Sequence, residues 1–134
     1  MNTSSKPIPS PTSATEPFWS GCARQELLLR CCKACGAFNA PTRYVCRCGC
    51  TELTWVPSSG RGIVYSFTVV HRAPDPSFKD DVPYVIAIVE LAEGVRLMSN
   101  IVSCSPEAVH IDMPVEVLFE TVSEGVGVAK FRPA

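Results

Sequence analysis

Two short cysteine pairs, each followed by a glycine, constrain this chain more than any other feature of its sequence. The first pair is Cys32 and Cys35, with Gly36 after it, and the second lies within 46–50, where a glycine follows Cys48. Two such pairs about ten residues apart can bring four thiolates to one tetrahedral ion. A glycine at the end of each pair lets the chain turn at positive φ, so that backbone amides face the sulfurs. The pattern therefore predicts a small metal-binding ribbon.

The identity of the fourth ligand is the open point of this pattern. One residue, and not two, separates Cys46 from Cys48, so the second pair departs from the usual spacing. Cys50 offers a wider alternative to Cys48, and Cys31 is a weaker alternative to Cys32. We favour Cys48 because it keeps the pairing of a cysteine with a following glycine. The predicted ligands of one zinc ion are Cys32, Cys35, Cys46 and Cys48, with Cys50 as the alternative to Cys48.

Two other interpretations of the cysteines compete with metal binding. They could be reduced, buried thiols, or Cys32 and Cys35 could form a redox pair, although such a pair usually lies near a βαβ pattern and the sequence shows none. Four thiolates leave a zinc ion no open position for water or substrate, so we expect a structural ion. Cys22 and Cys104 lie far from the cluster in the sequence and are predicted to be small hydrophobic residues.

The start of the sequence bears on the cellular context of these cysteines. An even number of cysteines, eight, would suit a secreted disulfide scaffold if an export signal preceded them. Residues 1–15 are mostly Ser, Thr and Pro with one Lys and no apolar run, so they do not have the pattern of a signal peptide. We predict that 1–15 is a disordered tail. We expect a cytoplasmic protein whose clustered cysteines bind metal.

A short helix is predicted directly after the tail, over 17–25. Pro17 suits a first helical turn, and Phe18, Trp19 and Cys22 fall on one face at helical spacing. Large aromatic side chains are usually core material. We therefore expect this face to pack on a neighbouring element, with partner binding as the alternative.

The second half of the chain has the pattern of a small all-β unit. Five segments rich in Val, Ile, Phe and Tyr are separated by Gly, Pro, Asp and Ser, with no strong helix pattern between them. This indicates a closed or partly closed barrel. A turn-rich joint at 58–62 divides the chain into a helix with the ribbon at 16–57 and the barrel at 58–134. The predicted strands are 63–70, 84–91, 95–102, 115–120 and 126–131.

The connections between these strands differ in length. Glu93 and Gly94 suit a tight hairpin turn between the second and third strands. The connection at 72–83 holds three prolines and exceeds a usual hairpin loop. Functional residues are expected on such long loops.

Charge and hydropathy disfavour several classes of partner. The formal net charge is −1 and the isoelectric point is about 6.1, so nothing drives the whole chain towards phosphate backbones or anionic membranes. No stretch approaches the roughly 18 apolar residues of a membrane span. A barrel with a metal ribbon could still bind single-stranded nucleic acid, which is our alternative function. Against it, the segments 63–70 and 84–91 contain no basic residue.

The sequence also lacks the common signatures of an enzyme. It contains neither a Gly-x-Ser-x-Gly elbow nor a phosphate-binding Gly-Lys loop, and its only histidines are His71 and His110. His110 lies between apolar neighbours and is predicted to be structural or exposed. Cys104 could serve as a nucleophile only with a paired base, and the sequence offers none. We therefore expect no catalytic residue.

Taken together, the order of these features resembles the DUF35 family. The resemblance covers nearly all of 16–134. It rests on the two cysteine pairs and on the segments 17–19 (PFW), 43–46 (RYVC), 52–55 (ELTW), 60–68 (GRGIVYSFT) and 131–133 (FRP). It implies a mainly β protein, in which a short N-terminal helix and a rubredoxin-like zinc ribbon precede a five-stranded OB-fold barrel.

The resemblance further implies an accessory subunit of thiolase-superfamily enzymes that act on acyl-CoA. Such a subunit would form a hetero-oligomer with the thiolase, help to form its acyl-CoA channel and support its active conformation. Family settings include aromatic acid degradation through benzoylsuccinyl-CoA and steroid side-chain degradation. Aromatic residues near turns would then be interface anchors: Phe18, Trp19, Phe38, Tyr44 and Phe78. Four residues are candidate contacts to CoA phosphates: His71, Arg72, Lys79 and Arg61.

Overall fold

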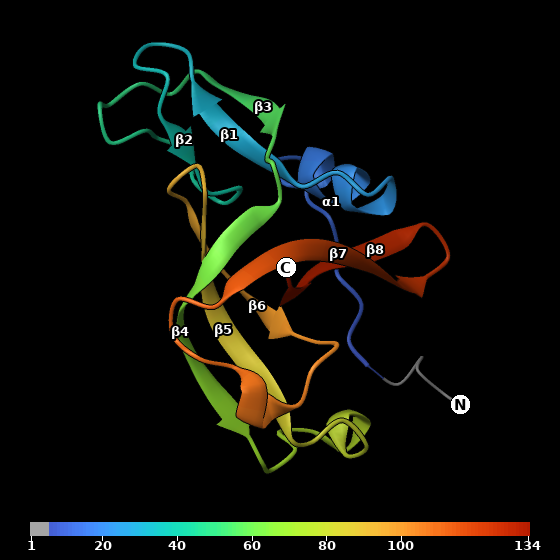
Figure 1. The fold of residues 1–134 in the computed structure, drawn as a ribbon. Coiled ribbons are helices and arrows are strands. Elements are labelled where there is room, and N and C mark those ends of the chain that lie inside the picture. Colours follow the sequence, from blue (N-terminus) through green and yellow to red (C-terminus); the bar gives the residue numbers. More distant parts are fainter. Residues whose placement is uncertain (1–5) are drawn as a thin grey trace.

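The computed structural model describes residues 6–134, in which a small three-stranded sheet and one helix lie at one end of a five-stranded closed barrel (Figure 1). The first five residues of the predicted tail lie outside the described residues. Residues 6–15 form no helix or strand. Lys6 nevertheless pairs with Asp81 and lies 5.5 Å from the ring centre of Phe78. Disorder of the tail stays a prediction.

The predicted helix is present as α1 (Glu16–Ala23) and ends two residues earlier than expected. It stops because the backbone leaves the helical conformation: Gln25 has a φ of 67°. Cys22 is buried, and Phe18 packs against the core of the barrel. A Cβ atom at Gly127 of the barrel would lie 2.9 Å from the Cys22 carbonyl oxygen. The helix therefore packs tightly on the barrel, as expected for its aromatic face.

The ribbon is an antiparallel sheet of three short strands in the order β2-β1-β3. Its strands are β1 (Leu28–Cys32), β2 (Phe38–Asn39) and β3 (Leu53–Pro57). The sequence pattern did not predict them as strands. Leu28 and Leu29 are adjacent in the chain and both buried, so β1 shows no alternation of buried and exposed positions.

The barrel contains all five predicted strands. They follow one another around the barrel in the order β4-β5-β6-β8-β7, and β7 closes it against β4. The largest difference from prediction is at the β7–β8 hairpin, where β7 extends three residues beyond the predicted end at 120. The mainly β fold class is thus confirmed. The strands are β4 (Arg61–Val70), β5 (Tyr84–Leu91), β6 (Arg96–Ile101), β7 (Pro114–Ser123) and β8 (Val126–Pro133).

One hydrophobic core fills the barrel and reaches into the ribbon. Alternate residues of β5 face it, and Phe131 of β8 is completely buried in it. Leu27 and Leu29, at the start of the ribbon, belong to the same cluster of buried side chains. Two single turns of 3₁₀ helix, η2 (Pro76–Phe78) and η3 (Pro106–Ala108), lie in the connections between strands. No helix within 6–134 has both the length and the apolar character that crossing a membrane requires.

The joint between ribbon and barrel is held by hydrogen bonds. The carboxylate of Glu93, in the β5–β6 turn, accepts from the Ser58 hydroxyl at 2.9 Å and from the Ser59 amide at 2.7 Å. Burial acts to raise the pKa of Glu93, but these hydrogen bonds outweigh it and lower the pKa. The Val117 amide donates to the Gly60 carbonyl oxygen at 2.8 Å. The predicted turn-rich segment is therefore an ordered connection.

Candidate metal centre

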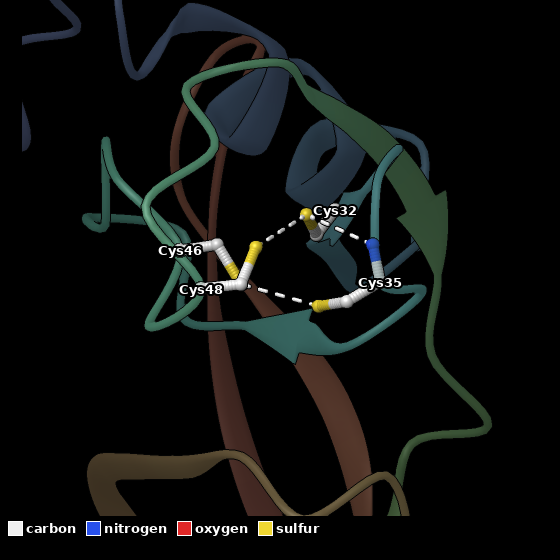
Figure 2. A group of neighbouring side chains, drawn as sticks. All are labelled: Cys32, Cys35, Cys46 and Cys48. Carbon is white, nitrogen blue, oxygen red and sulfur yellow. Dashed lines mark hydrogen bonds between the residues drawn. The ribbon is translucent and has the colours of Figure 1, made fainter.

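Four cysteine thiols meet inside the ribbon, and they come from two separate loops (Figure 2). Cys32 ends β1, and Cys35 follows it in the tight turn that leads to β2. Cys46 and Cys48 lie in the loop between β2 and β3. All four sulfur atoms lie within 4.8 Å of one another. The structure thus brings together the four residues that the sequence favoured as ligands.

The sulfur spacing fits a tetrahedral ion. Cys32 Sγ lies 3.6 Å from Cys48 Sγ, and Cys35 Sγ lies 3.6 Å from Cys46 Sγ. Four thiolates around one zinc at about 2.3 Å would be separated by about 3.8 Å, the edge of the tetrahedron. The donor set and its spacing can therefore hold a metal ion that prefers four sulfur ligands.

The backbone around the thiols follows the pattern of a metal-binding turn. The amides of Ala34 and Cys35 point at Cys32 Sγ from 3.3 Å and 3.4 Å. Gly36 and Gly49 have φ angles of 76° and 96°. A side chain at either glycine would meet no atom within 4 Å, so the positive φ itself is what requires glycine there. The predicted role of both glycines is confirmed.

Backbone amides around the four thiols also change the pKa values of those thiols. Hydrogen bonding from the Cys35 amide is the main cause that lowers the pKa of Cys32 to about 6. The Cys50 amide acts to lower the pKa of Cys48, but the interaction with Cys32 and burial outweigh it and raise that pKa to about 12. Cys32 is thus the first of the two to become a thiolate, the form that binds metal. Positive charge at the centre of the four sulfurs would favour ionisation of the others.

Cys31 and Cys50, the alternative ligands, lie outside this group of four. Cys31 Sγ lies 3.5 Å from the Gly36 carbonyl oxygen, and Cys50 Sγ accepts from the Glu52 amide at 3.3 Å. Adjacent residues of a strand face opposite sides, which explains why Cys31 and Cys32 diverge. Because Cys46 and Cys48 can both reach the cluster, the short spacing of the second pair is compatible with a single site.

The remaining cysteines and histidines are separate from the four thiols. Cys22 is a buried residue of α1, and burial raises the pKa of its thiol to about 11. Cys104 is half-buried against the barrel core. His71 and His110 are both exposed, and the Nδ1 atom of His110 lies 3.2 Å from the Ala108 carbonyl oxygen. Within 6–134 neither histidine forms a hydrogen bond with Cys104.

The four candidate contacts to CoA do not form one site. Arg61 begins β4 next to the ribbon, whereas His71 and Arg72 follow the other end of this ten-residue strand, about 30 Å away at roughly 3.3 Å per residue. Lys79 lies in the same connection as Arg72, directly after η2. All four side chains are exposed. The connection therefore brings three of them to one end of the barrel and leaves Arg61 at the opposite end.

The predicted interface aromatics divide into two groups. Phe18, Trp19 and Phe78 are half-buried, and Phe18 and Trp19 pack edge to face at 5.0 Å between ring centres. Phe38 and Tyr44, both on the ribbon, are exposed by 39% and 56%. Of these five aromatics, the two on the ribbon are therefore the more exposed, and Tyr65 of the barrel is 46% exposed. A signal missed in the sequence is Met98 of β6, which is 74% exposed.

Comparison with known proteins agrees with this architecture. A family described as "ChsH2, C-terminal OB-fold domain" matches residues 55–120. The solved structure entitled "Ltp2-ChsH2(DUF35) aldolase" superposes with a TM-score of 0.83 at 32% sequence identity, and the match covers 93% of this chain and 98% of that one.

Three relatives differ in how much of their length the chain covers. A probable enoyl-CoA hydratase alpha subunit of Thermomonospora curvata is 38% identical over 119 residues, but these span 87% of this chain and only 37% of the hydratase subunit. A benzoylsuccinyl-CoA thiolase subunit, BbsA, of Geobacter metallireducens is 33% identical over 70 residues, 52% of this chain and 46% of that protein. A DUF35 domain-containing scaffold protein of Methanocaldococcus jannaschii is 46% identical over 95 residues, 69% of this chain and 67% of that protein. Given this last match and the shared fold, the chain belongs to the DUF35 family.

Proposed function

We propose that this chain is a non-catalytic subunit that binds a thiolase-superfamily enzyme and supports acyl-CoA binding and the active conformation of that enzyme. The names of its relatives support this: one is a scaffold protein and another a subunit of an acyl-CoA thiolase. The observation that carries the proposal is the exposed aromatic surface of the ribbon, because exposed aromatic residues are typical anchors of protein interfaces.

The ribbon holds this surface in a defined position. The guanidinium group of Arg30 lies 5.4 Å from the ring centre of Tyr44 and 4.5 Å from that of Trp55. Its Nη1 atom donates to the Arg43 carbonyl oxygen at 2.8 Å. Tyr44 is therefore fixed on its inner side and exposed on its outer side, next to the exposed Val45. Such preorganisation reduces the entropy lost on binding a partner.

A structural zinc ion is part of the proposal. Cys32, Cys35, Cys46 and Cys48 would hold it, and it would stabilise the loops that carry Tyr44. A four-thiolate site leaves no position for substrate, and no histidine hydrogen-bonds Cys104 in the described part of the chain. We therefore expect the chain alone to catalyse neither thiolysis nor hydrolysis of acyl-CoA.

The cellular setting is inferred from the relatives and from the sequence. A thiolase that cleaves benzoylsuccinyl-CoA or a steroid side chain is the proposed partner, in a cytoplasmic hetero-oligomer. The hydratase alpha subunit of Thermomonospora curvata is much longer than this chain. Because its name refers to an enoyl-CoA hydratase, a hydratase partner is a variant of this proposal. The connection at 72–83, with Arg72 and Lys79, is the proposed element near bound acyl-CoA.

Co-expression with a thiolase-superfamily protein tests the proposal, and any thiolase encoded beside this chain is the first candidate. We expect a complex on size-exclusion chromatography, and thiolase activity that depends on it. Tyr44→Ser should weaken this complex about tenfold or more, as for an interface anchor. Ile111→Ser is the matched control, because Ile111 is 52% exposed on the barrel and should have little effect.

Three outcomes would contradict the proposal: no complex, a thiolase that is fully active alone, or equal effects of the two substitutions. Salt-sensitive binding of single-stranded nucleic acid would instead support the alternative function.

The metal ligands are tested separately by two serine variants. Cys48→Ser should release zinc, whereas Cys50→Ser should retain one zinc per chain, because Cys50 Sγ lies outside the group of four. Metal analysis of both purified variants checks this. Retention of zinc by Cys48→Ser and loss by Cys50→Ser would assign the fourth ligand to Cys50.

A further inference from the structure

Residues 6–15, which precede α1, follow the side of the barrel (Figure 1). At one end of this segment the ammonium group of Lys6 pairs with Asp81 and lies 5.5 Å from the ring centre of Phe78. Asp81 and Phe78 both belong to the connection at 72–83. At its other end the segment continues into α1. It therefore links the helix to a connection that lies far from it in the sequence.

The sequence of this segment favours an extended course. Pro7, Pro9 and Pro11 each fix φ near −65°, so ordering the segment costs less backbone entropy than it would without them. Next to α1 the amide of Thr12 donates to Thr15 Oγ1 at 3.0 Å, and the amide of Thr15 donates to Thr12 Oγ1 at 3.2 Å. This small turn fixes the direction in which the segment leaves the helix.

The contacts that hold the segment are few and partly exposed. The side chains of Lys6 and Asp81 are 35% and 40% exposed, and an ion pair of this kind shifts an equilibrium by about fivefold at most. A cation over an exposed ring contributes a similar factor. Pro9 and Pro11 form one wall of a groove of about 220 Å³ that Trp19 of α1 also lines, so this part is not tightly packed. The segment can therefore detach without unfolding the barrel.

The connection at 72–83 has little structure of its own. Its single turn, η2, contains no buried residue. The turn is closed by hydrogen bonds from the Phe78 amide to the Asp75 carbonyl oxygen at 2.9 Å and from the Asp81 amide to the Phe78 carbonyl oxygen at 3.0 Å. Phe78 also packs on Tyr84 of β5, at 6.0 Å between ring centres. Among the ion pairs of residues 6–134, Lys6 is the partner of Asp81, and no other cation pairs with it.

We propose that residues 6–12 form a reversible strap. With Lys6 bound to Phe78 and Asp81, the strap holds the connection at 72–83 in one conformation, and release of Lys6 frees the connection. The two contacts together favour the bound state by about tenfold. Once released, Phe78 and Asp81 present a ring beside a carboxylate, which suits a lysine or arginine side chain of a partner.

Only the step that involves a partner rests on the proposed function. A cation of the thiolase that binds Phe78 and Asp81 has to displace Lys6. The bound strap then lowers the apparent affinity of that contact by about the same tenfold factor. The strap is thus an autoinhibitory contact whose strength depends on one ammonium group.

Hydrogen exchange of the purified, zinc-loaded chain, read by NMR, tests the strap without a partner. The amides of Phe78 and Asp81 report on the connection because both close the η2 turn. Lys6→Met keeps a long apolar side chain but removes the charge, and it should speed exchange at both amides about fivefold. Sodium chloride at about 1 M, where the Debye length is about 3 Å, should speed exchange in the wild-type chain and have little effect in Lys6→Met.

Two controls separate the strap from a general effect of charge. Lys130→Met removes an ion pair with Glu120 on the β7–β8 hairpin and should leave exchange at Phe78 and Asp81 unchanged. Lys6→Glu combined with Asp81→Lys exchanges the two charges, and this double variant should exchange more slowly at Phe78 than either single variant. In the complex with a thiolase, Lys6→Met should bind about fivefold more tightly than the wild-type chain.

Equal exchange in the wild-type chain and Lys6→Met overturns the strap. So does wild-type exchange at Phe78 and Asp81 as fast as in an unstructured peptide, or an equal acceleration by Lys130→Met. Unchanged affinity of Lys6→Met for the thiolase overturns the competition with a partner cation. Because the exchange experiment uses the chain alone, its failure leaves complex formation, and hence the proposed function, a separate question.

Discussion

The ribbon and the barrel reach a fixed structure by different means. The barrel buries a continuous cluster of side chains between strands of six to ten residues. The ribbon has strands of five, two and five residues, and from 33 to 55 only Asn39, Pro41 and Cys46 are buried. So little buried apolar surface does not offset the entropy of ordering some twenty residues. The contrast indicates that the four thiols replace a hydrophobic core in the ribbon.

Metal removal should produce the largest difference in stability between the ribbon and the barrel. Structural zinc contributes about 10–16 kcal/mol to small zinc-binding peptides, so chelation or Cys32→Ser should unfold the ribbon beyond β1. The barrel should keep its strands because its core contains none of the four thiols. Hydrogen exchange of backbone amides checks this: protection should be lost at 33–52 and kept in β5. A ribbon that stays protected without metal would show that hydrogen bonds alone hold it.

Truncation of the barrel core should have the next largest effect. Phe131→Ala removes a ring that is completely buried, and we expect the free energy of unfolding to fall by about 3–5 kcal/mol. Urea denaturation followed by fluorescence measures this loss. Phe38→Ala, on the exposed ribbon surface, is the control and should change the free energy of unfolding by about 0.5 kcal/mol or less. Equal losses would mean that ribbon and barrel do not differ as described.

The smallest effect concerns the acidity of thiols outside the ribbon. Burial raises the pKa of Cys22 to about 11, so only about one thiol in a thousand is ionised at pH 8. Alkylation of Cys22 in the folded protein should therefore be slow, and should become faster as pH rises towards 11.

The same shift links Cys22 to stability. A raised pKa favours the folded state while the thiol is protonated, below its ordinary value of 9.0, and this contribution is lost as pH rises through about 11. Cys22→Ala should remove that part of the pH dependence. Mass spectrometry of alkylated peptides follows the reaction, and rapid labelling of Cys22 at pH 8 would show that α1 opens readily.

The sequence predicted the barrel more completely than the ribbon, for a physical reason. Strand β5 is an eight-residue run, YVIAIVEL, in which only Glu90 is polar or charged, and a run of this length and composition predicts a buried strand although the alternation of burial itself does not show in the sequence. In β1 both faces are covered, so adjacent leucines are buried and no period appears. The four thiols were predictable because a metal site requires fixed residue types at short spacing.

The cleft between the ribbon and the barrel, lined by Arg43, Arg47 and Arg96, could not be predicted from the sequence. Arg43 and Arg96 are 53 positions apart, and they line one cleft only because the β5–β6 turn lies beside the ribbon. The chain as a whole carries a net charge of −1, which gives no sign of a local positive site.

The Glu93 carboxylate that binds Ser58 and Ser59 has a consequence for assembly. With the joint held in this way, the ribbon aromatics and the far end of the barrel keep a constant separation. A partner that contacts both then binds two surfaces of one rigid body and loses rotational and translational freedom only once. Glu93→Ala would remove two of the hydrogen bonds at the joint and leave the shared core around Leu27 and Leu29 in place, so the affinity for such a partner should fall in proportion to the added freedom at the joint.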